Sequence, residues 1–261
     1  MNPLQLVRTT GRFFIALVVL SNIPYIRLIQ IFGYDDVLRE PVDVVLTQFQ
    51  AGGTELILTW LGFALAALLL IPASVLLHQV MKLQAQQSDS PVLAIATLMG
   101  ALSGLLQGIG LMRWVFVVPV LARLYTDAST TSTTREAISI VYQAVHQYGG
   151  VVLGEHLGQT LLVGWTIGIC LSMRSSLLFK SWVAWMGLFT TPLLLLGQSE
   201  LLATVMPGMP VIETTPIGFI LWEVWMLVVG ISLMRVPRQR LGLRPLAAQR
   251  GAIASDTRVL S

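Results

Sequence analysis

The segment HQYGGVVLGEHLGQ, residues 146–159, gathers the residue types that could do chemistry in this chain. It holds His146, Glu155, His156 and Gln159 at the start of a long apolar run. Imidazole and carboxylate groups can relay protons, bind metals or hold a polar ligand. Such groups are costly inside a membrane unless they are paired or hydrated, so they are candidates for a functional site.

A metal site in this segment would need a break in the helix. His146 and His156 are ten residues apart, which is about 15 Å along a continuous α-helix and too far to share one ion. Gly149–Gly150 would be the place for such a break. The sequence predicts no cofactor, and a divalent metal held by His146, His156 and Glu155 is the alternative.

Other ionisable residues are expected at a similar depth, near the outer ends of the helices. These are Arg27, Arg113 and Glu223, and together with the segment 146–159 they define one candidate ligand-binding set: Glu155, His156, Gln159, Glu223, Arg27, Arg113 and His146. Two of these groups are carboxylates and two are arginines, so ion pairs can compensate much of the charge. The plainer alternative is that these charges reach the interface or only lock the bundle together.

The composition indicates that most of this protein is surrounded by lipid. Hydrophobic residues make up 55% of the 261 residues, charged residues make up 11%, and the mean hydropathy is +0.76. A soluble domain of this size could not cover so much apolar surface. A single cysteine, Cys170, excludes a disulfide framework.

Apolar windows of about 20 residues predict an all-α integral membrane bundle of six transmembrane helices. The expected spans are Phe13–Phe32, Thr54–Leu77, Pro91–Met112, Val151–Met173, Trp182–Val205 and Ile217–Met234. Arginine and lysine fall mainly on the segments that face the cytoplasm if both termini are cytoplasmic. The chain is therefore divided into a transmembrane domain, residues 1–235, and a basic cytoplasmic tail, residues 236–261.

Two apolar segments on the outer side are too short to span. Pro41–Gln50 is expected to form a short interfacial helix, with Val42, Val45, Leu46 and Phe49 on one face. Arg113–Tyr125 has 13 residues and contains Pro119. It lies in the interface, re-enters the membrane, or extends the third helix.

Two glycine triplets at four-residue spacing predict close packing of the third and fourth helices. They are Gly100, Gly104 and Gly108 in the third helix and Gly150, Gly154 and Gly158 in the fourth. Small residues at this spacing let two helix backbones approach closely in a membrane. The expected contact is between Gly104 and Gly154.

Several segments resemble a bacterial multi-pass membrane family known as domain of unknown function 4386. They are REPVDVVLTQFQAGG, RWVFVVPVLARLY, HQYGGVVLGEHLGQ, GQSELLATVMPG and PIGFILWEVW. The resemblance covers roughly Arg12 to Arg235 and implies about six helices in a bacterial inner membrane. It implies no activity, so no catalytic residue is carried over.

The function expected from the residues is the binding or transport of a small polar or amphiphilic molecule, or proton relay, through an outward-facing pocket. The alternatives are an intramembrane, metal-dependent hydrolase and a non-catalytic subunit of a membrane complex. Expected partners are membrane lipids and a small-molecule ligand, with no nucleic acid. The sequence favours a protein that is not an enzyme, and it leaves the oligomeric state open.

Overall fold

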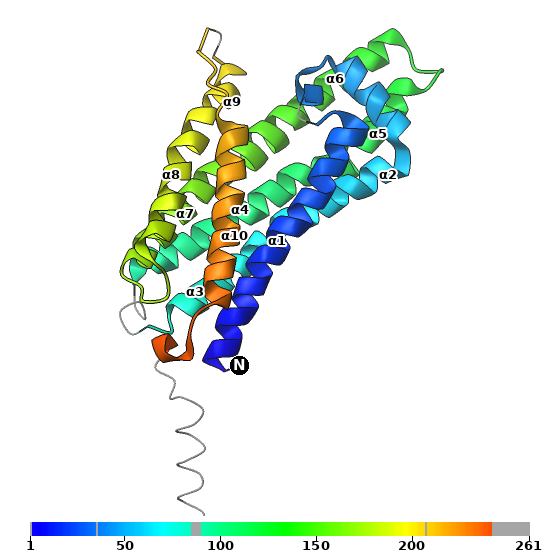
Figure 1. The fold of residues 1–261 in the computed structure, drawn as a ribbon. Helices are drawn as coiled ribbons and strands as arrows, with labels where there is room; N and C mark the ends of the chain where they lie inside the picture. The colour runs from blue at the N-terminus through cyan, green and yellow to red at the C-terminus, as the bar shows by residue number, and fades with distance from the viewer. Residues whose placement is uncertain (1, 35, 85–89, 207, 242–261) are drawn as a thin grey trace, which may run out of the picture.

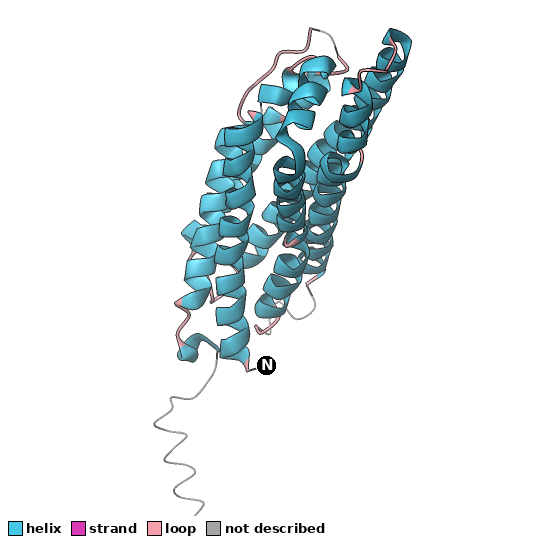
Figure 2. Ribbon diagram, turned by 90° about the vertical axis from the view of Figure 1, so that its right-hand side faces the viewer, coloured by secondary structure: helices cyan, strands magenta, loops and turns pink. Residues whose placement is uncertain are grey.

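The protein is an elongated bundle of helices, described here from a computed structural model (Figures 1 and 2). The structure describes residues 2–34, 36–84, 90–206 and 208–241, and these residues form helices and connecting loops without a β-strand. The predicted all-α membrane class is therefore confirmed. The predicted basic tail lies for the most part outside the described residues.

The first two spans are antiparallel helices joined at the end of the bundle opposite the N-terminus, which we call the far end. Helix α1, Pro3–Phe32, begins at the N-cap Asn2 and ends at Gly33, whose positive φ of 66° terminates the helix. After the short 3-10 helix η1, Asp36–Arg39, the chain returns through α2, Val42–Leu68, and α3, Leu70–Met81.

A short helix is present at the expected segment Pro41–Gln50, where it forms the first part of α2 and is followed by a sharp kink. Helix α2 runs through this segment and kinks at Gly53, where φ is 55° and ψ is −145°. Val45, Leu46 and Phe49 are buried against α1 and α5 side chains of the far end, because their apolar face finds protein rather than the membrane surface.

The course of the third span decides between the three alternatives expected for Arg113–Tyr125. Helix α4, Pro91–Phe116, bends at Val117 and continues as α5, Val118–Thr126. The apolar segment that contains Pro119 is therefore an extension of the third helix. Proline fits this position because it is at the start of α5, where its missing N–H costs no helical hydrogen bond.

The fourth span is the longest and carries the segment 146–159. It consists of α6, Ser132–Val145, the π-helix η3, His146–Leu157, and α7, Gly158–Arg174. The chain ends with α8, Ser181–Gly197, the short α9, Ser199–Ala203, then α10, Thr215–Met234, and the 3-10 helix η4, Arg238–Leu241.

The count of six spans is approximate. Five helices among the described residues are long and apolar enough to cross a membrane, and they correspond to the first, second, third, fourth and sixth predicted spans. Helix α8 stands in the place of the fifth span but has only 17 residues before the chain bends at Gln198. The N-terminus and the end of α10 lie at the same end of the bundle (Figure 1).

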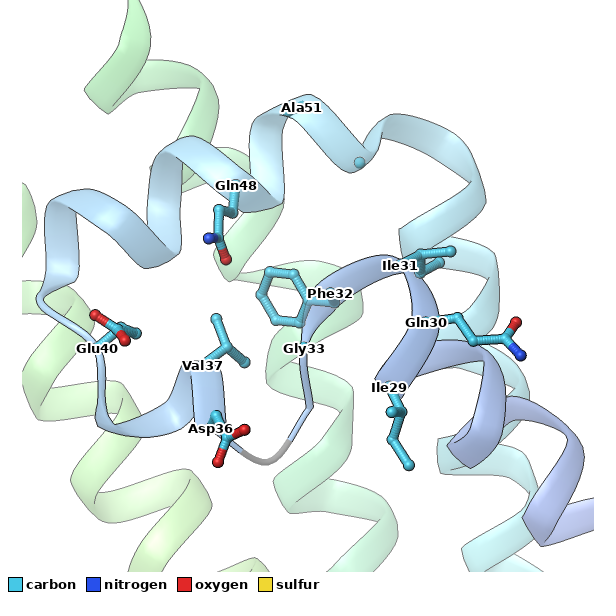
Figure 3. A pocket seen from close by; sticks show the side chains of 11 residues that line it. Ile29, Gln30, Ile31, Phe32, Gly33, Asp36, Val37, Glu40, Gln48 and Ala51 are labelled. Atoms are coloured by element: carbon cyan, nitrogen blue, oxygen red, sulfur yellow. The ribbon is translucent and has the colours of Figure 1, made fainter.

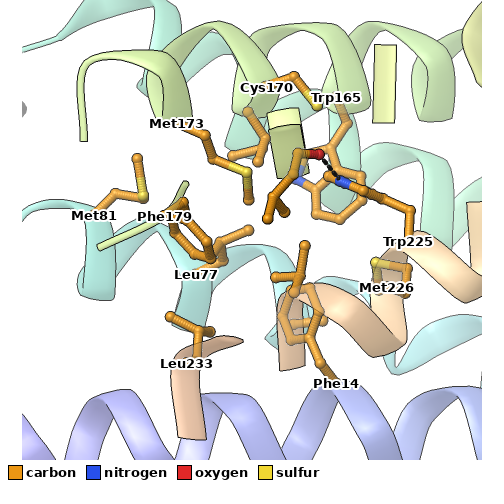
Figure 4. Packing of buried hydrophobic residues seen from close by; sticks show 14 of the residues in the cluster. Phe14, Leu77, Met81, Trp165, Cys170, Met173, Phe179, Trp225, Met226 and Leu233 are labelled. Carbon is orange, nitrogen blue, oxygen red and sulfur yellow. Dashed lines mark hydrogen bonds between the residues drawn. The ribbon is translucent and has the colours of Figure 1, made fainter. Parts of the chain in front are cut away.

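Two hydrophobic clusters hold the bundle together. The first lies nearer the N-terminal end and joins side chains from α1, α3, α7, α8 and α10, including Phe14, Trp165 and Trp225 (Figure 4). The indole of Trp225 donates a hydrogen bond of 2.9 Å to the Val183 carbonyl across α10 and α8. The second cluster lies at the far end, where α1, α2, α4, α5 and α6 meet.

The predicted contact between the third and fourth helices is present, but the predicted glycine pair is wrong. A Cβ atom on Gly110 would lie 2.6 Å from the Cα atom of Gly154, so these two backbones touch. A Cβ atom on Gly104 would instead meet Ala67 and Leu70 at 3.0 Å. The glycine triplet of α4 faces the second span, because the rotation of the helix about its axis follows the whole packing surface rather than the triplet alone.

Candidate functional site

Arg113 is a buried cation with incomplete compensation of its charge. Its side chain lies on α4 and the residue is only 7% exposed. The Nη1 atom donates a hydrogen bond of 2.6 Å to the Gly110 carbonyl, and Nη2 lies 3.8 Å from Oε1 of Glu155. That separation is an ion pair without a direct hydrogen bond, so the guanidinium retains capacity to bind an acceptor.

Glu155 and His156 are presented by a π-helix rather than by an α-helix. In η3 each main-chain hydrogen bond spans five residues, so the turn is wider than the 3.6-residue turn on which a helical-wheel prediction depends. Runs of π-helix are rare and occur frequently at functional sites.

One glycine of the π-helix, Gly150, makes room for the guanidinium. A Cβ atom on Gly150 would lie 2.5 Å from Cζ of Arg113, whereas one on Gly149 would meet Cδ at an ordinary 4.0 Å. Gly149–Gly150, expected as a possible break, thus lies within a continuous helix and packs against Arg113. The arginine can be buried here because no side chain occupies this face of η3.

Aromatic rings surround the arginine on its other side. The guanidinium lies 5.3 Å from the ring centre of Trp114, a cation–π contact. The Trp114 ring stacks on Trp60 with centroids 4.8 Å apart, and the His146 ring stacks on Tyr142 at 5.6 Å. We call Arg113, Glu155, His146, Trp114 and Trp60 the Arg113 cluster.

Several buried polar atoms in and beside this cluster have no hydrogen-bond partner within the described part of the chain. The donors are Arg113 Nε, Trp60 Nε1 and Trp114 Nε1, and the further atoms are His146 Nδ1, His156 Nδ1 and Gln159 Oε1. Buried polar atoms are almost always hydrogen-bonded, so such a concentration requires an explanation. A bound molecule that accepts hydrogen bonds would satisfy the donors.

The metal alternative finds no support in the geometry. Among residues 2–34, 36–84, 90–206 and 208–241, no group of three or more histidine, cysteine, aspartate or glutamate side chains could hold a metal ion. His146 and His156 remain at opposite ends of one continuous η3 helix. The set His146, His156 and Glu155 is therefore not assembled as a metal site.

Arg27 and Glu223, the other two charged candidates, have partners elsewhere. Arg27 forms an ion pair with Glu55 on the exposed surface between α1 and α2. Glu223 is hydrogen-bonded to Asn22 across α10 and α1, at 2.9 Å between Oε2 and Nδ2. The structure thus brings Arg113 to Glu155, with His146 beside them, but it does not gather the whole predicted set in one place.

A separate pocket of about 620 Å³ opens at the far end (Figure 3). It lies between the end of α1, η1 and the first half of α2, and its polar side chains are Gln30, Asp36, Glu40 and Gln48. None of the candidate ligand-binding residues lines it. The polar residues that line this pocket are therefore different from the candidate residues that the sequence pattern indicates.

Two polar contacts hold α9 against η1 and against the start of η3 at the far end. Arg39 of η1 forms an ion pair with Glu200 of α9, and the hydrogen bond that Arg39 donates to Glu200 raises the pKa of Arg39 above its ordinary value. Gln147 Nε2 donates a hydrogen bond of 2.9 Å to Oγ1 of Thr204, just after α9. Residue 147 follows His146, so this contact holds α9 against the start of η3.

Four residues that take part in these contacts are not among the candidates from the sequence: Trp60, Trp114, Glu55 and Asn22. Each of the two tryptophans brings a buried N–H group. Glu55 and Asn22 are single polar residues inside apolar runs. That isolation was the available signal, because a polar side chain inside a span requires a partner on another helix.

The comparison with known protein families agrees with this architecture. Residues 9–230 match the model of a family described as a domain of unknown function (DUF4386). The chain belongs to this family of helical, membrane-type proteins. No curated protein matches the chain, and no solved structure matches it.

Proposed function

We propose that the chain binds a small amphiphilic molecule inside the membrane and holds its polar head group at the Arg113 cluster. The observation that carries the proposal is the burial of Arg113 beside a π-helix, with its nearest carboxylate 3.8 Å away. A desolvated guanidinium with a free N–H group favours a ligand that brings negative charge.

The unsatisfied donors define the head group further. Three N–H groups, on Arg113, Trp60 and Trp114, lack an acceptor. This favours a ligand with an oxygen-rich group such as a carboxylate or a phosphate. The aromatic rings of Trp60 and Trp114 would contact the apolar part of the molecule. A single-chain lipid or a fatty acid has this combination of chemistry.

We also propose that the protein lies in a bacterial inner membrane with both termini in the cytoplasm. The excess of arginine and lysine at the N-terminal end of the bundle supports this orientation, since Lys82, Arg174 and Lys180 lie in or beside its connecting segments. The Arg113 cluster then lies in the half of the bundle that is nearer the periplasm.

The test compares an acidic with a neutral amphiphile of the same chain length. The protein, purified in dodecyl maltoside, is heated with dodecanoate or with dodecanol, and the unfolding temperature is measured. Dodecanoate is expected to raise the Tm in a saturable way, because a ligand stabilises the state to which it binds. An equal effect of dodecanol would contradict recognition of the head group.

A conservative substitution identifies the binding residue. Arg113→Lys keeps the charge but loses the planar fork of donors, so it is expected to reduce the dodecanoate shift severalfold. Arg27→Lys is the matched control, since Arg27 is exposed and already paired with Glu55. A loss of the shift in both variants, or in neither, would place the ligand elsewhere.

A further inference from the structure

Glu223 lies in a groove that is separate from the Arg113 cluster. The groove lies between α1 and α10 and has a volume of about 370 Å³. Apart from Asn22 and Glu223 its lining is apolar, and Val19, Ile220 and Val224 beside it are exposed. Since exposed apolar residues on a spanning helix face lipid, the groove opens toward the hydrocarbon of the membrane.

The hydrogen bonds around Glu223 indicate which atom carries a proton. Nδ2 of Asn22 lies 2.9 Å from the Val18 carbonyl and 2.9 Å from Oε2 of Glu223, so the amide donates one hydrogen to each. Oε2 is therefore an acceptor. This contact also fixes the orientation of the amide, because an amide oxygen could not lie against the Val18 carbonyl.

The second carboxyl oxygen has a different environment. Oγ of Ser21 lies 3.0 Å from the Val18 carbonyl and 3.5 Å from Oε1 of Glu223. A hydroxyl group has a single hydrogen, and the carbonyl is the nearer acceptor. The hydroxyl therefore donates mainly to the carbonyl and does little to stabilise a negative charge on Oε1.

No positive charge among the described residues compensates Glu223. None of the ion pairs of the described chain includes it. Helix α10 packs against α1 and α8, and its Trp222 also contacts α7. Helix α8 contains no ionisable side chain, and α7 carries a positive charge only at its last residue, Arg174. On α1, Arg27 is paired with Glu55, and Arg8 and Arg12 lie in the first third of the helix. An ionised carboxylate facing hydrocarbon without a cation is strongly disfavoured relative to a neutral carboxyl group.

From this geometry we infer that Glu223, Asn22 and Ser21 form a lipid-facing proton-binding site. The carboxyl group of Glu223 carries one proton on Oε1, and it can release that proton as H⁺ to an acceptor that enters the groove. Asn22 orients the carboxyl group through Oε2, and the Ser21 hydroxyl lies 3.5 Å from Oε1. This site goes beyond the amphiphile-binding function, because it shares no residue with the Arg113 cluster.

The experiment uses a lipid-soluble reagent that is specific for protonated carboxyl groups. The O–H group of a carboxylic acid adds across a C=N bond of dicyclohexylcarbodiimide, and the product rearranges to a stable N-acylurea with no atom lost. With the protein in phosphatidylcholine vesicles at about pH 7, mass spectrometry is expected to find the adduct on Glu223. Labelling is expected to fall as the pH is raised further and the proton is lost.

Comparison of reagents and variants makes the result decisive. A water-soluble carbodiimide is expected to modify the exposed Glu55 and Asp36 but not Glu223. Glu223→Gln keeps the shape of the side chain and must remove the adduct. Asn22→Lys supplies a cation, so Glu223 should become ionised and lose most of its labelling.

Two outcomes would overturn the inference with the unmodified protein alone. Absence of an adduct on Glu223 at any pH would mean that the carboxyl group is ionised. Equal labelling of Glu223 by the water-soluble reagent would mean that the groove opens to water rather than to lipid. Neither outcome affects the test with dodecanoate at Arg113.

Discussion

The guanidinium of Arg113 lies 3.8 Å from the carboxylate of Glu155, and the two residues come from different spans, α4 and η3. Arg113 is buried, whereas the Glu155 side chain is 32% exposed. The carboxylate therefore lies at the edge of the site and the arginine lies inside it. Each residue limits the electrostatic cost of placing the other's charge inside the bundle.

Glu155→Gln is expected to destabilise the protein by about 1–3 kcal/mol, because it leaves the buried guanidinium without its carboxylate. Replacing both partners, as Glu155→Gln with Arg113→Leu, should recover part of the loss. Thermal unfolding in detergent measures both effects. The control combines Glu155→Gln with Arg27→Leu and should be additive, since Arg27 pairs with Glu55. Additive losses for the Arg113 combination would mean that the pair contributes nothing.

Gly150→Ala is expected to cost about 1–3 kcal/mol, because its Cβ atom would lie 2.5 Å from Cζ of Arg113 and the guanidinium would have to move. Gly149→Ala is the matched control, with its closest contact at 4.0 Å. It should be neutral, or stabilising by up to about 1 kcal/mol, as glycine-to-alanine changes in helices are. The unfolding temperatures of the two variants give the comparison, and equal losses would refute the packing of Gly150 on the arginine.

Gly110→Ala is expected to separate α4 from η3, since the added Cβ atom would lie 2.6 Å from Cα of Gly154 and 2.8 Å from the Gly149 carbonyl. A backbone neighbour cannot turn aside as a side chain can, so the loss should be about 2 kcal/mol or more. Gly62→Ala, with a nearest contact of 3.8 Å, should be tolerated. Proteolysis and thermal unfolding of both variants would detect the difference. A stable Gly110→Ala protein would show that the helices are further apart.

The loop between α5 and α6 should depend on pH through Asp127. Hydrogen bonds from the hydroxyl and the main-chain N–H of Ser129 hold the pKa of Asp127 below its ordinary value of 3.8. Because the pKa is lower in the folded loop, this stabilisation is complete above the ordinary value and is lost as the pH falls through the lowered value.

The amide resonance of Ser129 in a micelle sample is expected to titrate with a midpoint below 3.8, the ordinary value for Asp127. Asp127→Asn should abolish the titration, since an amide does not ionise in this range. A midpoint at or above the ordinary value would mean that the turn does not favour the charged form of the carboxyl group.

Reporter fusions test the proposed orientation. A fusion at Thr130, in the loop after α5, and a fusion after Leu241 should report opposite sides of the membrane, with Leu241 on the cytoplasmic side. The physical reason is the concentration of arginine and lysine at the N-terminal end of the bundle. A periplasmic signal at Leu241 would contradict the proposed orientation, and the same signal at both sites would refute an odd number of crossings between Thr130 and Leu241.

The amino-acid sequence by itself determined the class of the protein and most of its elements. Long apolar runs with few charges must be helices in lipid, because every main-chain polar group there has to be satisfied within its own segment. The family resemblance followed from local motifs and is confirmed over residues 9–230. The short α8 differs from the predicted fifth span because the chain bends at Gln198, whereas the kink at Gly53 separates the expected short helix from the second span.

Only the tertiary structure decided which polar residues meet. Helix periodicity indicates that Glu155 needs a partner, but the rotation and tilt of each helix select Arg113 over Arg27 and direct Glu223 toward Asn22. These rotations are set by packing along the whole length of a helix, as the contact of Gly110 with Gly154 illustrates. The π-helix η3 could not be predicted from its local sequence for the same reason, because its wide turn packs against Arg113 from another span.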